Sequence, residues 1–139
     1  MTEALILVVS GWRHWLGESF ILTNLRRYTM ERGADGIHIR VGDCQSGVDR
    51  IVREYLHSRV YSFTVYDADW STGRTGGPIR NRSMLLGKHG GDRFPEVLAH
   101  KLLAFPQPGL SLASRGSGTA DCVRQAFTLG VGLDVPGTR

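Results

Sequence analysis

The sequence has few cysteines, no long apolar run and no low-complexity segment. Its two cysteines, Cys44 and Cys122, set no disulfide framework, and neither has a second Cys or a His at a spacing typical of zinc ligation. We therefore expect no structural metal, and nothing in the chain calls for a cofactor. No apolar stretch approaches the roughly 18 residues that span a bilayer, and the first residues lack the pattern of a signal peptide. We expect a cytoplasmic protein without membrane segments.

Length and composition favour one compact domain over residues 1–139. The chain has 139 residues and is 41% hydrophobic, which is enough for one substantial core. The net charge of +4 comes from arginine far more than from lysine. This charge is compatible with a polyanionic ligand, but a solvated basic surface explains it equally well.

The hydrophobic pattern predicts strands that alternate with helices. The apolar run at 4–9 is typical of a parallel strand buried on both faces. Further strands are expected at 37–41, 61–66, 101–105 and 131–135, and helices at 17–32, 46–56, 79–87 and 119–129. This order predicts an α/β fold: a single Rossmann-like, open, mostly parallel sheet of about five strands with helices on both faces.

Four glycine-containing loops follow predicted strands, at 10–15, 42–47, 69–80 and 106–119. In an open parallel sheet such loops share the carboxyl edge, where ligands bind. The segment 75–84 brings Gly76, Gly77 and Pro78 directly to a cationic helix, so we expect an anion there, most plausibly a phosphate. Residues 116–119 open the last helix and also suit a phosphate, although a flexible N-capping turn is an equal alternative.

Several charged and aromatic residues in these loops have two interpretations. Asp49 stands in a capping-box relation to Ser46, which competes with a role in binding a ribose hydroxyl. Asp69 has no such local explanation, whereas the helix dipole alone favours Asp121 in a first turn. Arg13 offers a bidentate phosphate contact or a plain surface charge. The tryptophans, Trp70 among them, suit base stacking or core packing.

The candidate catalytic residues are Arg80 and Asp121. The candidate ligand-binding residues are Ser10, Gly11, Arg13, Gly42, Cys44, Ser46, Gly47, Asp49, Asp69, Trp70, Gly77, Arg80, Asn81, Gly116, Ser117, Gly118 and Thr119.

The order of these motifs resembles the YspA-like branch of the SLOG superfamily, over nearly the whole chain. The resemblance rests on the runs Ser10-Gly11-Trp12-Arg13-x-Trp15, Gly42-Asp43-Cys44-x-Ser46-Gly47-x-Asp49, Asp69-Trp70, Gly77-Pro78-Ile79-Arg80-Asn81-x-x-Met84, Ala104-Phe105-Pro106 and Gly118-Thr119-x-Asp121-Cys122-Val123. The second and fourth runs are the most specific.

This resemblance implies a Rossmann-like fold that binds nucleotides or nucleotide-derived ligands, in a dimer or higher homo-oligomer. The superfamily includes the LOG phosphoribohydrolases and the DNA-processing protein DprA. Arg80 and Met84 match the first LOG active-site run. In the second run Gly116, Gly118 and Thr119 match, but Cys122 stands where LOG enzymes have a catalytic Glu. Since cleavage of an N-glycosidic bond needs a carboxylate, the replacement favours binding over hydrolysis.

Three functions therefore follow from the sequence. The first is a sensor or sequestering protein for a nucleotide-derived small molecule. The second is a nucleotide N-glycosidase in which Asp121, Asp69 or Asp49 replaces the missing Glu. The third, which the modest net charge makes the weakest, is single-stranded nucleic-acid binding through the Arg and Trp loops.

Overall fold

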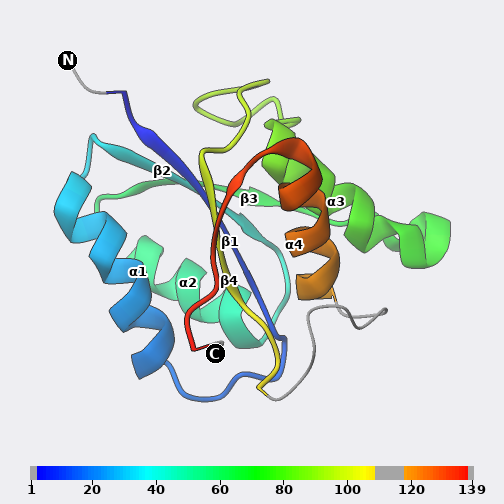
Figure 1. The fold of residues 1–139 in the computed structure, drawn as a ribbon, viewed down its shortest axis with the longest axis horizontal. Coiled ribbons are helices and arrows are strands. Elements are labelled where there is room, and N and C mark those ends of the chain that lie inside the picture. Colours follow the sequence, from blue (N-terminus) through cyan, green and yellow to red (C-terminus); the bar gives the residue numbers. More distant parts are fainter. Residues whose placement is uncertain (1–2, 109–117, 138–139) are drawn as a thin grey trace.

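A computed structural model describes residues 3–108 and 118–137 of the chain. Within them, five strands form one sheet in the order β3-β2-β1-β4-β5, and each neighbouring pair is parallel (Figure 1). The strands are β1 (Leu5–Gly11), β2 (Ile37–Gly42), β3 (Ser62–Tyr66), β4 (Lys101–Phe105) and β5 (Gly132–Asp134). All five coincide with predicted strands, and the sheet is parallel throughout rather than mostly so.

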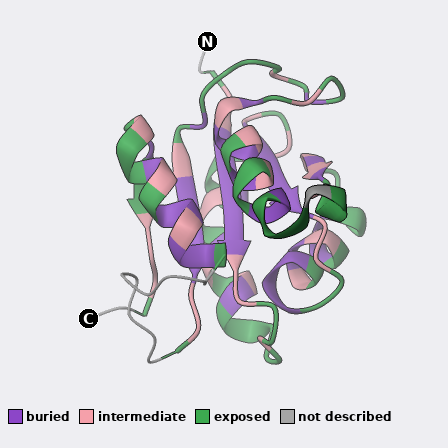
Figure 2. Cartoon of the chain, turned by 90° about the vertical axis from the view of Figure 1, so that its right-hand side faces the viewer, coloured by how far each residue is buried: buried purple, intermediate pink, exposed green. Residues whose placement is uncertain are grey.

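Helices cover both faces of this sheet. In the described residues they are α1 (Ser19–Arg32), α2 (Gly47–His57), α3 (Gly76–Leu86) and α4 (Gly118–Leu129), together with the 3-10 helix η1 (Trp70–Thr75). The helices α1 and α2 share a core with Leu7 and Val9 of β1, whereas α3 and α4 share one with Ile6 and Val8. Successive strand residues point to opposite faces, so β1 is buried on both sides (Figure 2). The Rossmann-like α/β prediction is thereby confirmed. Among the helices described, none has the length and apolar character that crossing a membrane requires.

The start of α3 differs from the prediction. The sequence suggested a long polar loop up to Pro78, but η1 occupies much of it and α3 begins at Gly76. The indole of Trp70 lies against the first turn: a Cβ on Gly77 would stand 3.3 Å from the Trp70 ring, and one on Gly76 would overlap the Asp69 carbonyl oxygen. The glycines therefore serve close packing at the helix start, which periodicity does not reveal.

The predicted capping box at the start of α2 is wrong. Ser46 is the N-cap residue but makes no side-chain cap; its Oγ instead donates to the carbonyl oxygen of Arg13 at 2.7 Å. Asp49 turns away from Ser46, and its Oδ2 accepts a hydrogen bond from the Cys44 amide at 3.3 Å. The loop after β1 packs against this helix start, and that tertiary contact replaces the local one.

A charged residue of β2 is buried in the α3/α4 face. Arg40 is 0% exposed. Its Nε donates to Asp92 Oδ2 at 2.8 Å, and its two terminal nitrogens donate to the carbonyl oxygens of Met84 and Phe94. Each guanidinium nitrogen thus has an acceptor, so the charge is tolerated away from water.

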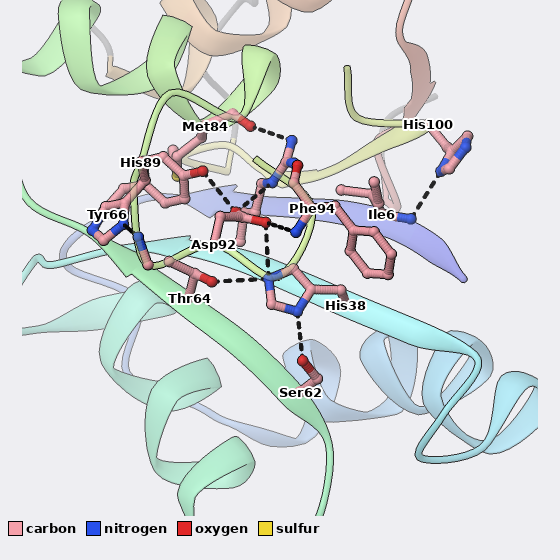
Figure 3. A network of polar contacts seen from close by, with 12 residues as sticks. Ile6, His38, Ser62, Thr64, Tyr66, Met84, His89, Asp92, Phe94 and His100 are labelled. Carbon is pink, nitrogen blue, oxygen red and sulfur yellow. Dashed lines mark hydrogen bonds and ion pairs between the residues drawn. The ribbon is translucent and has the colours of Figure 1, made fainter. Parts of the chain in front are cut away.

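Asp92 also joins β2 to β3 (Figure 3). Tyr66 donates to Asp92 Oδ2 at 2.7 Å. His38 lies 3.4 Å from Asp92 Oδ1, and its other ring nitrogen is hydrogen-bonded to Ser62 at 2.6 Å. Burial lowers the pKa of His38, and the Asp92 charge opposes that effect only in part. The network is a structural clamp on the loop that precedes β4.

Candidate functional site

The candidate site lies at the carboxyl edge of the sheet, around the end of β1. From β1 the chain runs outward through β2 to β3 and then returns to β4 on the other side of β1. The helices after β1 and β4 lie on opposite faces, so the chain diverges where these two strands end, which is where parallel sheets bind ligands. The Trp12 amide donates to the Phe105 carbonyl oxygen at 2.9 Å and ties the ends of β1 and β4 together.

Two side chains border the space directly above the end of β2. A Cβ on Gly42 would stand 2.6 Å from Asp49 Oδ2 and 2.7 Å from Arg80 Nη1. Both groups therefore occupy the space that any larger residue at this position would take. Gly42 is required here because a carboxylate of α2 and a guanidinium of α3 converge on its backbone.

Arg80 is fixed at this edge by two of its nitrogens. Its Nη1 lies 2.9 Å from Asp43 Oδ1, and its Nε donates to Asn81 Oδ1 at 3.2 Å. The Arg80 side chain is 14% exposed and that of Asp43 30%. The remaining Nη2 makes no hydrogen bond or ion pair with the described ranges 3–108 and 118–137. The guanidinium is thus held in place while one nitrogen is left to meet a ligand.

Asn81 links α3 to the start of α4. Its Nδ2 donates to the Gly118 carbonyl oxygen at 3.1 Å and to Asp121 Oδ2 at 3.0 Å. Gln125 donates to the same Asp121 oxygen at 2.9 Å. Asn81 is 2% exposed. The two helix starts are therefore held together by a buried amide, and Asp121 has a structural role as the acceptor between them.

Asp49 is the most perturbed acid of the site. Burial raises the pKa of its carboxyl to about 6, although the charge of Arg80 and the Cys44 amide oppose the rise. Arg53, one turn further along α2, is a weaker cationic neighbour and donates to the Gly42 carbonyl oxygen at 2.8 Å. Perturbed carboxyls of this kind gather at functional sites, because a structural role rarely needs a costly buried charge.

The thiol of Cys122, in the first turns of α4, is unreactive. Cys122 is fully buried, and this burial raises its pKa to about 12, while a hydrogen bond with Ser10 lowers it slightly. A neutral thiol in an apolar setting is a poor nucleophile and a poor base. Cys122 and Ser10 consequently form the packed floor of the site.

The structure places some predicted site residues elsewhere. Arg13, Ser46 and Gly47 line a separate groove of about 500 Å³ between the loop after β1 and α2, together with Trp15 and Ile51. The side chains of Arg13 and Ser46 therefore make no hydrogen bond with Arg80.

Asp69 has a local role that the sequence did not reveal. It caps η1, accepting from the Ser71 amide at 3.0 Å and from the Ser71 hydroxyl at 2.6 Å. The neighbouring Trp70 lies over Gly77, and it is 56% exposed. The expectation that Asp69 lacks a structural explanation was therefore wrong. The Trp70 ring remains accessible to a ligand.

The predicted phosphate loop is only partly described. Gly116 and Ser117 lie outside the described residues. Gly118 is the first residue of α4, and Thr119 is 4% exposed. Within the described residues no cluster of His, Cys, Asp and Glu is suited to a metal ion.

Three residues of the site were missed by the sequence interpretation. They are Asp43, Arg53 and Gln125. Arg53 follows Asp49 by one helical turn, so the helical period could have placed both above β2. Asp43 directly follows Gly42 at the edge, which was a usable signal, but nothing in the sequence tied Gln125 to Asp121 and α3 beyond its spacing.

Comparisons with known proteins identify no relative. No protein-family model, no curated protein and no solved structure matches the chain. The geometry of the carboxyl edge is therefore the main basis for a functional proposal.

Proposed function

We propose that this protein binds a nucleotide or nucleotide-derived small molecule at the carboxyl edge of its sheet, as a sensor or sequestering protein. The observation that carries the proposal is Arg80, anchored through Nη1 and Nε, with no hydrogen bond from its Nη2 to the residues that the structure describes. A guanidinium that is fixed before binding loses little side-chain entropy when it meets a phosphate.

The surroundings of Arg80 suit the rest of a nucleotide. The start of α4 lies next to Asn81 and offers backbone amides and the positive end of a helix dipole. Trp70 rests on the first turn of α3 with its ring partly exposed, which suits stacking on a base. Asp43 at the edge offers an acceptor for a ribose hydroxyl.

The sequence resemblance supports the same proposal. The resemblance assigns Arg80 to a ligand-contacting position and matches Met84 to the same run, and Met84 is buried in this protein. Membership of the SLOG superfamily is accordingly part of the proposal, as is the homo-oligomer that it implies.

Calorimetric titration tests the proposal with a panel of mono-, di- and cyclic nucleotides, NAD and ADP-ribose. We expect at least one ligand to bind, and Arg80→Ala to weaken it at least tenfold, about 1.4 kcal/mol or more. Arg82→Ala is the matched control, because Arg82 is exposed on the same helix and faces a different hollow, so the same charge change leaves affinity unaltered. Absence of binding at millimolar ligand would refute the proposal.

A second candidate, a nucleotide N-glycosidase, is favoured by one observation. Asp49, with a pKa near neutrality, lies beside Arg80 and has the proton affinity of a general acid or base. Asp121 and Asp69 are weaker choices, since both carboxylates accept structural hydrogen bonds. The same panel, analysed for released base, separates the two functions: turnover abolished in Asp49→Asn supports the enzyme, and intact ligand after prolonged incubation excludes it.

A further inference from the structure

We propose that capture of an anion by Arg80 is coupled to the uptake of one proton by Asp49, so that affinity rises as the pH falls. The inference rests on the proposed function for the identity of the ligand. The coupling itself requires only an anion at Arg80, whether a free ion or the phosphate of a nucleotide.

The geometry brings the two groups to one point. Asp49 Oδ2 and Arg80 Nη1 both border the space above Gly42, at 2.6 Å and 2.7 Å from where a Cβ would stand. Asp49 is 7% exposed. An anion that binds Arg80 therefore brings negative charge close to a carboxylate that water cannot screen.

Charged and titratable groups face Asp49 from each element packed around it. Arg80 approaches from α3 and Arg53 from α2, and both favour the carboxylate. Asp43 in the loop after β2 opposes it, and Cys122 of α4 interacts with it across the floor of the site. Cys44 contributes its backbone amide. Arg80 is the strongest cationic support among these groups.

Binding of an anion to Arg80 weakens the electrostatic stabilisation of the Asp49 carboxylate. In the free protein burial already outweighs the nearby cations, and it raises the pKa of Asp49 to about 6. When an anion binds the Arg80 guanidinium, which stays anchored to Asp43 and Asn81, the Asp49 carboxylate faces a second negative group and gains a proton instead. Each unit by which binding raises this pKa makes the bound state about tenfold more favourable in acid than in base.

The alternative is that Asp49 only accepts the Cys44 hydrogen bond. Asp49→Asn separates these roles, because the amide oxygen of Asn still accepts from Cys44 while the charge is gone. A purely structural Asp49 predicts that this substitution leaves the pH dependence of binding unchanged.

The test uses two probes whose own charges do not change in this range: inorganic sulfate, followed by NMR titration, and ADP-ribose, followed by calorimetry. We expect the wild-type protein to bind both about tenfold more tightly at about pH 5.5 than at about pH 8. Calorimetry in two buffers of different ionisation enthalpy should show about half a proton taken up per ADP-ribose bound at about pH 7, since a tenfold effect raises the pKa of Asp49 by about one unit. Asp49→Asn should bind at both pH values with nearly the acid-form affinity of the wild-type protein.

Controls assign the proton to Asp49. Asp43→Asn also removes a carboxylate near Arg80 but leaves Asp49 in place, so the pH dependence of sulfate affinity should persist whatever the change in the affinity itself. The surface histidines are present in every variant, so their titration cannot produce a difference between Asp49→Asn and the wild-type protein. The coupling is overturned if the affinity of Asp49→Asn still rises as the pH falls, or if the affinity of the wild-type protein does not change with pH. Sulfate binding with this pH dependence but no nucleotide binding would refute the proposed function alone, and pH-independent nucleotide binding would refute the coupling alone.

Discussion

The buried carboxyl of Asp49 lowers the stability of the protein at neutral pH. Its folded-state pKa of about 6 lies above the ordinary value of 3.8, so the folded protein holds this proton more tightly than the unfolded chain. The resulting stability is fully present below the unfolded pKa and is lost as the pH rises through the folded one. At neutral pH the buried carboxylate is therefore a net cost.

The first prediction is that Asp49→Asn stabilises the free protein by about 2–3 kcal/mol at about pH 7, since a neutral amide avoids the desolvation of a charge. The gain should vanish near pH 4, where the wild-type carboxyl is protonated too. Urea unfolding at several pH values measures the difference. Asp43→Asn serves as the control: Asp43 is partly exposed and paired with Arg80, so its loss should bring no gain. Equal stability of Asp49→Asn and wild type at neutral pH would contradict this reading.

At the scale of elements, the close approach of Asp49 from α2 and Arg80 from α3 depends on Gly42. The second prediction is that Gly42→Ala destabilises the fold by about 1–3 kcal/mol and weakens ADP-ribose binding at least tenfold, because the added methyl displaces Asp49 and Arg80. Calorimetry and thermal unfolding measure the two effects. Gly17→Ala is the matched control, since a Cβ there meets nothing within 4 Å. Unchanged binding in Gly42→Ala would show that the two side chains have room to move apart.

The sequence predicted elements well where one pattern decides them. The apolar run at 4–9 can only be a strand buried on both faces, and Gly33 ends α1 as expected. The prediction failed where tertiary contacts override local ones. Ser46 and Asp49 have capping-box spacing, yet Ser46 bonds the Arg13 carbonyl instead. Asp69 caps a helix only because η1 forms directly after it.

The site was predictable to a similar extent. The topology brings the loops of Gly11, Gly42 and Arg80 to one edge, as the strand order requires. The pairing of Arg80 with Asp43, and of Asn81 with the start of α4, depends on how the helices pack across the face. Hydrophobic periodicity carries no information about such polar contacts.

At the scale of the whole molecule, Asp92 holds together parts that are far apart in the sequence. It accepts from Arg40 of β2 and Tyr66 of β3, and its Oδ1 accepts from the Phe94 amide in its own loop. Both Arg40 and Asp92 have fully buried side chains. A buried pair of this kind adds little net stability by itself, but either partner alone is a severe cost.

The third prediction is that Asp92→Asn destabilises the protein by about 3 kcal/mol or more, because the Arg40 charge is then left without a counter-charge in a site that water does not reach. Urea unfolding at neutral pH measures this loss. Glu54→Gln is the control with the same charge change in an exposed pair with Arg50, where the expected loss is about 0.5 kcal/mol. Similar losses in the two variants would show that Arg40 finds other partners when Asp92 is neutral, and that the loop before β4 is held by its apolar contacts instead.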